Sequence, residues 1–181
     1  IDQGSDAFLS FLVATHFATA LVLLGFFWRD WLNIVTGMLR SLKERRISAD
    51  DTYAKIGWLL VVGTMPAGIL GLLFEQPLKQ LFAAAPVVAG ALMLNGVVLY
   101  VAELRRKHAP EGAADDARIA ALSWKQVIGI GVMQCGALIP GLSRTGLTMT
   151  GGLMSRLSHE NAARFSFLLA TPIIFAASLL Q

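Results

Sequence analysis

Charged residues are scarce in this chain of 181 residues. Asp, Glu, Lys and Arg together make up 15% of it, whereas hydrophobic residues make up 55% and the mean hydropathy is +0.62. A soluble domain has roughly 25% charged residues. The hydrophobic residues occur in blocks of about twenty, which is the length that a helix needs to cross the hydrocarbon core of a bilayer. The composition therefore argues against an ordinary soluble domain and predicts a single integral membrane domain over residues 1–181.

Several common functional signatures are also missing. The chain has a single cysteine, Cys135, which excludes an internal disulfide bond. No His and Cys residues have the spacing of a zinc site. The glycine-rich turn at residues 141–146 lacks the lysine of a P-loop, which argues against a nucleoside triphosphatase. The pI is about 9.4, but the basic residues lie at the ends of apolar blocks, so we expect them to orient the chain in a membrane and expect no nucleic-acid partner.

Both ends of the sequence look like internal points of a longer chain. No initiator Met and no signal-peptide pattern precede Ile1. The last apolar run, residues 165–180, would extend only about 24 Å as a helix, which is less than the hydrocarbon core of about 30 Å. We therefore expect this chain to be part of a larger protein.

Three apolar segments are long enough to span a membrane as helices: residues 7–27, 56–74 and 83–102. Residues 28–46 are amphipathic and basic, which favours a helix along the membrane surface. Residues 103–123 form the most polar stretch and predict an exposed loop with a short helix towards its end. We expect His16 to lie hydrogen-bonded inside the bundle and Asn95 to join two helices.

The distribution of basic residues predicts the topology. Most Lys and Arg residues follow the first and third spans, so the positive-inside rule places both segments in the cytoplasm. Residues 124–139 and 146–155 are apolar arms that would extend only about 24 Å and about 15 Å as helices. Because Arg156 and Arg164 follow the second arm, this segment should begin and end inside. We therefore predict an all-α, polytopic membrane protein in which the two arms form one re-entrant helical hairpin.

A polar turn joins the two arms and places a permanently charged residue near the middle of the membrane. An arginine at that depth costs about 2.5 kcal/mol or more, which indicates a function for Arg144. Ser143, Thr145 and Thr148 fall within one turn of it. A guanidinium, hydroxyl groups and the free N–H groups of a helix start, expected here at Gly146, together suit a phosphate. The turn therefore predicts a buried anion site, and the alternative is a structural salt bridge of Arg144 within the bundle.

The residues of this turn closely resemble the second signature of the bacterial undecaprenyl-diphosphate phosphatases, the bacitracin-resistance family. The matching residues are Gln134, Ala137, Pro140, Gly141, Ser143, Arg144, Thr145, Gly146 and Thr148. Thr145 stands where the family usually has Ser, which keeps the hydroxyl group. Residues 161–172 also resemble this family. An earlier Glu-rich signature and later membrane helices of the family lie outside the chain.

The resemblance implies an enzyme of the bacterial inner membrane that hydrolyses undecaprenyl diphosphate to undecaprenyl phosphate and phosphate, recycling the lipid carrier of peptidoglycan synthesis. It also implies inverted repeats with one re-entrant hairpin each, so that this chain would hold half of the fold. Arg144 would neutralise charge on the transferring phosphoryl group, while Ser143, Thr145 and Thr148 would orient oxygens. Gly141, Gly146 and Gln134 would complete the phosphate site.

A divalent metal, Mg or Ca, is also implied by the resemblance, and we assign none of its ligands to this chain. A second class of function stays open, namely a membrane transporter or lipid-carrier binding protein with a phosphate pocket and no hydrolytic chemistry. The expected partners are a polyprenyl diphosphate lipid and the membrane, and a homo-oligomer is compatible with the sequence.

Overall fold

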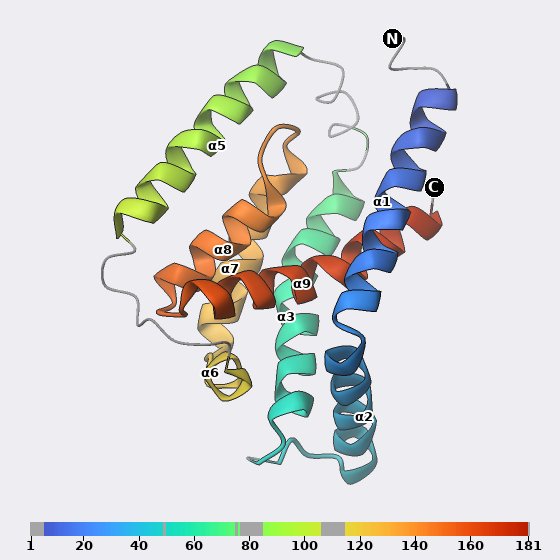
Figure 1. Cartoon of the computed structure of the whole chain (residues 1–181), viewed down its shortest axis with the longest axis vertical. Coiled ribbons are helices and arrows are strands. Elements are labelled where there is room, and N and C mark those ends of the chain that lie inside the picture. Colours follow the sequence, from blue (N-terminus) through green and yellow to red (C-terminus); the bar gives the residue numbers. More distant parts are fainter. Residues whose placement is uncertain (1–5, 49, 75, 77–84, 106–114, 181) are drawn as a thin grey trace.

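Helices are the regular elements in the part of the chain that the structure describes. The structure is a computed structural model that describes residues 6–48, 50–74, 76, 85–105 and 115–180. The longer helices are α1 (Asp6–Phe26), α2 (Trp28–Glu44), α3 (Thr52–Leu73), α5 (Ala85–Arg105), α7 (Trp124–Cys135), α8 (Arg144–Met154) and α9 (His159–Leu180). The short helix α6 (Asp116–Ala120) and the 3-10 turn η2 (Gly136–Leu138) complete the fold (Figure 1). The all-α prediction is confirmed for these residues.

Two of the predicted spans correspond to helices that are long and apolar enough to cross a membrane. These are α3 and the Ala85–Leu104 part of α5. The span predicted at residues 7–27 is α1, whose Ala14–Phe26 part together with α2 is also long and apolar enough to cross a membrane. The chain bends by 79° between these two helices at Phe27. The described residues thus contain two membrane-spanning candidates, or three if the bent pair is one span.

The amphipathic helix predicted at residues 28–46 is α2. Its buried side consists of Ile34, Gly37 and Ser41, whereas Leu32 and Leu39 on other sides are exposed. A Cβ atom on Gly37 would lie 2.7 Å from the backbone nitrogen of Ala54, so α2 and α3 touch at their backbones. Helix α2 ends where Arg45 adopts a left-handed conformation, with φ of 53°. The chain then turns directly into α3.

The predicted helical hairpin is present as two antiparallel helices, α7 and α8. Helix α7 begins at a capping box in which Ser123 and Gln126 bind each other's backbone N–H groups. At the foot of the hairpin, Gln126 Nε2 donates a hydrogen bond to the carbonyl oxygen of Ser155 at 3.2 Å. Near its tip, a Cβ on Gly136 would lie 3.0 Å from the side chain of Leu147. The hairpin therefore turns where the sequence places Pro140 and Gly141.

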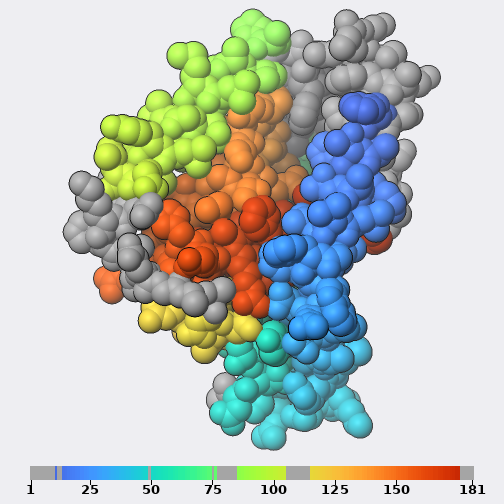
Figure 2. Space-filling view, in the orientation of Figure 1, coloured from blue at the N-terminus to red at the C-terminus, as the bar shows by residue number. Residues whose placement is uncertain are grey.

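Helix α9 crosses the bundle from the foot of α8 to α1, and α3 and α7 pack side by side (Figure 1). Phe165, Leu168 and Leu169 of α9 are buried against the other helices. Helix α5 contacts α8 and forms the outer edge of the molecule beside it (Figure 2). The hairpin is thus held between α3, α5 and α9. The middle of the polar loop predicted at residues 103–123 lies outside the described residues, and its end forms α6.

Candidate anion site at the tip of the hairpin

The side chain of Ser143 caps the N-terminus of α8. Its Oγ accepts a hydrogen bond from the Gly146 N–H at 3.1 Å, which satisfies one of the N–H groups that a helix start leaves without a partner. The N–H of Ser143 donates to Oδ1 of Asn95 in α5 at 3.0 Å. Asn95 therefore joins α5 to the hairpin tip, and its prediction as an interhelical hydrogen-bonding residue is confirmed.

Gly141 allows the turn before this cap to approach α5 closely. Its φ is +99°, a region that residues with a side chain rarely adopt. A Cβ at this position would lie 2.6 Å from the carbonyl oxygen of Val88 and 3.0 Å from the Cβ of Ala91. Pro140 beside it is buried. The glycine is thus required both by the backbone conformation and by the contact with α5.

Arg144 is the first residue of α8, two residues before the predicted helix start at Gly146. Its side chain is half-buried. Among the described residues, no Asp or Glu forms an ion pair with it. The salt-bridge alternative therefore finds no partner in this part of the chain. A half-buried guanidinium without a carboxylate beside it is costly unless another anion occupies the site.

The hydroxyl groups of the turn bind the backbone of α8 rather than one another. Thr148 is completely buried, and its Oγ1 donates to the carbonyl oxygens of Arg144 at 2.9 Å and Thr145 at 3.2 Å. Because Ser143 Oγ occupies the Gly146 N–H, that group is not free as expected from the sequence. The N–H groups of Arg144 and Thr145 are then the ones at this helix start that lack an intrahelical acceptor. The first turn of α8 thus combines the Arg144 guanidinium, the half-buried Thr145 and two N–H groups without an intrahelical acceptor.

Gln134 lies on the buried side of α7, and 1% of its surface is exposed. Neither its Oε1 nor its Nε2 has a hydrogen-bond partner among the described residues. An unsatisfied buried amide costs about 1–3 kcal/mol, so a residue of this kind needs an explanation such as a bound ligand or water. Gly131, one turn earlier, packs against the backbone of Gly63 in α3. Gln134 is therefore placed inside the bundle and not on its lipid-facing surface.

Metal-binding groups were predicted to lie outside this chain. In the described ranges, no three His, Cys, Asp or Glu side chains are grouped closely enough to hold a metal ion. The requirement for Mg or Ca stays a prediction. His16, expected inside the bundle, is exposed on α1 in the described part of the chain.

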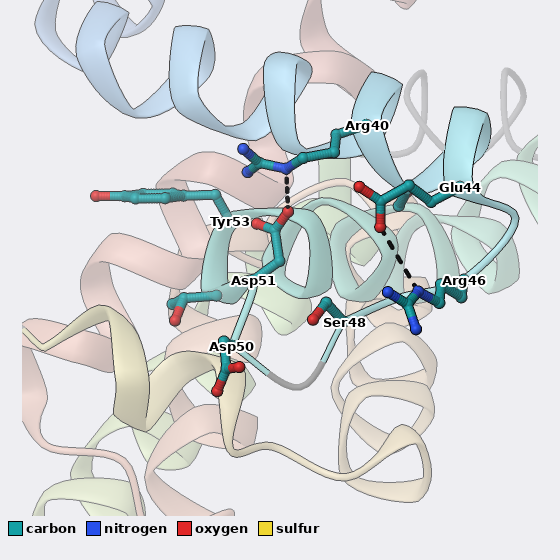
Figure 3. A pocket seen from close by; sticks show the side chains of 9 residues that line it. Arg40, Glu44, Arg46, Ser48, Asp50, Asp51 and Tyr53 are labelled. Carbon is teal, nitrogen blue, oxygen red and sulfur yellow. Dashed lines mark hydrogen bonds and ion pairs between the residues drawn. The ribbon is translucent and has the colours of Figure 1, made fainter.

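Two polar features away from the hairpin tip were not predicted from the sequence. One is a cavity of about 540 Å³ at the corner between α2 and α3 (Figure 3). Its arginines are paired, Arg40 Nε with Asp51 at 2.7 Å and Arg46 Nε with Glu44 at 3.6 Å. The hydrogen bond from Arg40 holds the pKa of the Asp51 carboxyl below its usual range. Four of the five charged side chains that line the cavity are therefore paired, and Asp50 is the fifth.

The second feature is a cluster at the foot of the hairpin, formed by Asp30, Tyr53, Asp116 and Arg164. Arg164 follows the second arm and was expected to face water on the cytoplasmic side. Its side chain is only 20% exposed and pairs with Asp30 and Asp116. Asp30 and Arg164 are 134 positions apart in the sequence. Local patterns do not reveal a contact over that separation, because an acidic residue in the first turn of a helix, such as Asp30 in α2, is common without any distant partner.

These features define an all-helical membrane protein with an arginine and hydroxyl groups at the start of a broken helix. The chain belongs to the family of bacitracin resistance proteins BacA, which it matches over residues 1–181. It is 47% identical to an undecaprenyl-diphosphatase of Mycolicibacterium paratuberculosis, with 98% of this chain and 62% of the relative covered. An undecaprenyl-diphosphatase of Gluconobacter oxydans is 45% identical over the same shares. Undecaprenyl-diphosphatase 2 of Burkholderia ambifaria is 42% identical, covering 100% of this chain.

The chain spans 62% of the length of these curated relatives. The match of the family over residues 1–181 confirms the predicted family and includes every segment from which the anion site was inferred.

Proposed function

We propose that this chain forms the cationic part of the active site of an undecaprenyl-diphosphate phosphatase. The reaction would transfer the terminal phosphoryl group of undecaprenyl diphosphate to water, giving undecaprenyl phosphate and inorganic phosphate. The observation that carries the proposal is Arg144, half-buried at the start of α8 and without an ion pair to a described carboxylate. The activity for which three relatives are named is the same.

Arg144 would bind the terminal phosphoryl group and neutralise the charge that develops on its oxygens. The N–H groups of Arg144 and Thr145 would add donors at the positive end of α8. The Thr145 hydroxyl would orient one phosphate oxygen, while Ser143 and Thr148 hold the first turn in shape through their backbone hydrogen bonds. Gly141 and Gly146 would contribute to the phosphate site by letting the turn pack closely on α5, and Gln134 would donate its free amide.

A divalent cation, Mg or Ca, would polarise the phosphate and help to form the nucleophile when it is bound. The described residues do not offer a group of ligands for such an ion. We therefore propose that its ligands, and the base that accepts a proton from water, lie outside the described residues.

The charge pattern supports a re-entrant position for the hairpin in the bacterial inner membrane. The feet of α7 and α8 lie together, joined by Gln126 and Ser155, so both arms would enter from one side. Lys125 and Arg156 at these feet would then lie in the cytoplasm. The remaining helices would cross the membrane several times, and the chain would form one half of an inverted-repeat fold with this hairpin as its re-entrant element.

The proposal is tested by measuring inorganic phosphate released from a polyprenyl diphosphate by the full-length protein in detergent. Release is expected, and Arg144→Ala should lower the turnover at least 10²-fold, in line with the loss of a donor aimed at developing charge. Arg29→Ala is a matched control, since Arg29 lies on α2 over the ring of Trp28 and should not affect turnover. A protein that binds the lipid but releases no phosphate is instead a transporter or lipid-carrier binding protein.

A further inference from the structure

Arg164 holds together four elements at the foot of the hairpin. One of its guanidinium nitrogens, Nη2, donates to Oδ1 of Asp30 in α2, and the other, Nη1, lies 2.9 Å from Oδ1 of Asp116 in α6. The Tyr53 hydroxyl of α3 donates to the second oxygen of Asp116 at 2.8 Å. We refer to these four residues as the foot cluster. It joins α2, α3, α6 and α9 through a single arginine.

The geometry of the foot cluster suits an arginine and no other side chain. Two carboxylates bind different nitrogens of one planar guanidinium, which a lysine ammonium cannot reproduce in the same arrangement. The side chains of Asp30, Asp116 and Arg164 are 19%, 25% and 20% exposed. Removal of the arginine would therefore leave two carboxylates close to each other and largely shielded from water.

Both arms of the hairpin are connected to this arginine. Asp116 begins α6, which leads through the Ser123 cap directly into α7. On the other arm, a Cβ on Gly152 of α8 would lie 3.0 Å from Ala162, which is two residues before Arg164 in α9. Asn161 strengthens the same joint, because its Oδ1 accepts the N–H of Asp115 at 2.8 Å. The feet of α7 and α8 are thus fixed relative to α2 and α3 at one point.

A small movement at the foot produces a larger one at the anion site. Helix α8 has 11 residues and is therefore about 16 Å long at 1.5 Å per residue. A tilt of about 5° at its foot would displace Arg144 by about 1.4 Å over that length. A misplacement of about 1 Å can lower a reaction rate about 10²-fold.

From these contacts we infer that Arg164 is a positioning residue, which sets the orientation of the hairpin and thereby the location of Arg144. Arg164 does not touch the anion site itself. The effect on catalysis rests on the proposed function, whereas the effect on the orientation of the hairpin does not.

The test uses the full-length protein in a background where Cys135 is the sole cysteine. Cys135 ends α7 close to the tip, and its half-buried Sγ donates to the Gly131 carbonyl oxygen. Its rate of modification by N-ethylmaleimide therefore reports the packing of the tip without any turnover. The second readout is kcat and KM for phosphate release from a polyprenyl diphosphate.

Arg164→Ala should lower kcat at least tenfold, change KM less than threefold and raise the modification rate of Cys135 at least threefold. Arg118→Ala is the matched control, because Arg118 pairs with Asp115 on α6 but is 55% exposed; it should change neither readout. Asp116→Asn removes the ion pair to α6 alone and should shift both readouts in the same direction by a smaller amount. If Arg164→Ala does not fold, Asp30→Asn removes one ion pair and should give an intermediate effect on both.

Unchanged kcat and unchanged Cys135 modification in Arg164→Ala, or in Asp30→Asn if only that variant folds, would refute the positioning role. The role is also refuted if Arg164→Ala lowers kcat but leaves the Cys135 rate unchanged, since the loss of turnover would then not come from the orientation of the hairpin. If the unmodified protein releases no phosphate but Arg164→Ala still raises the Cys135 rate, the proposed enzymatic function fails while the control of the hairpin by Arg164 stands.

Discussion

Replacing Gly141 with alanine tests how closely the hairpin tip packs against α5. The φ of +99° at this position imposes strain on a residue with a side chain of about 1–3 kcal/mol. The added Cβ would also lie 2.6 Å from the Val88 carbonyl oxygen. Non-bonded heavy atoms prefer separations of about 3.5 Å or more, so the turn must move away from α5 by roughly 0.5–1 Å.

This movement would weaken the bond that joins the two elements. The Ser143 N–H lies 3.0 Å from Asn95 Oδ1, and an increase of that size would bring it beyond hydrogen-bonding distance. The net loss for one such bond is about 1 kcal/mol. Together with the backbone strain, Gly141→Ala should lower the free energy of unfolding by roughly 2–4 kcal/mol.

Thermal unfolding of the full-length protein in detergent measures this loss, and phosphate release measures its effect on the site. Gly90→Ala is the matched control, because Gly90 lies on the same part of α5 and a Cβ there has nothing within 4 Å. The control should keep or slightly raise the Tm, since alanine favours a helix by about 1 kcal/mol over glycine. If Gly141→Ala unfolds and hydrolyses its substrate like the control, the close packing of the tip on α5 is wrong.

Three further predictions concern the anion site, the topology and the corner between α2 and α3. Arg144→Lys should recover little of the turnover lost in Arg144→Ala, because a point charge cannot replace the two-pronged guanidinium, whereas Thr145→Ser should be nearly silent in the same phosphate-release assay. In a background without Cys135, single cysteines can replace Lys43, Lys125, His159 or Gln76. The first three should be protected from a membrane-impermeant thiol reagent in intact cells, while the one at Gln76 should be labelled. Labelling at Lys125 but not at His159 would mean that the hairpin crosses the membrane. Because Arg40 lowers the pKa of Asp51 in the folded state, their pairing stabilises the fold above about pH 4 and this contribution is lost as the pH falls through the lowered pKa. Arg40→Ala should therefore lower the Tm at pH 7 by more than at pH 3, and equal shifts at both pH values would contradict the assignment.

The helices and the break between α7 and α8 could be predicted because their signals are local. Blocks of apolar residues define α3 and α5, and Pro140 with Gly141 cannot continue a helix. Ser143 is a residue type that caps helices, which makes the start of α8 at Arg144 understandable in retrospect. The prediction of a start at Gly146 treats this serine as a phosphate ligand and not as the cap.

The partners of the polar side chains could not be predicted in the same way. Thr148 was expected to face a ligand, but its hydroxyl can also bind a carbonyl oxygen one turn earlier, and the structure shows this second choice. The contact between Asp30 and Arg164 depends on how α9 crosses the bundle. Such contacts are decided by tertiary packing, which hydrophobic periodicity does not specify.

The contrast between the two half-buried arginines of this region supports the proposed site. Arg164 binds two carboxylates of the chain, so its charge is already compensated. Arg144 is half-buried as well, yet no described carboxylate pairs with it, and the carboxylates of the foot cluster belong to the opposite end of the hairpin. The fold thus provides two carboxylates for Arg164 and none among the described residues for Arg144. The guanidinium of Arg144 is therefore available to bind an anion. A lipid diphosphate, with several negative oxygens and an apolar chain, has the charge and the polarity that this position in a membrane protein requires.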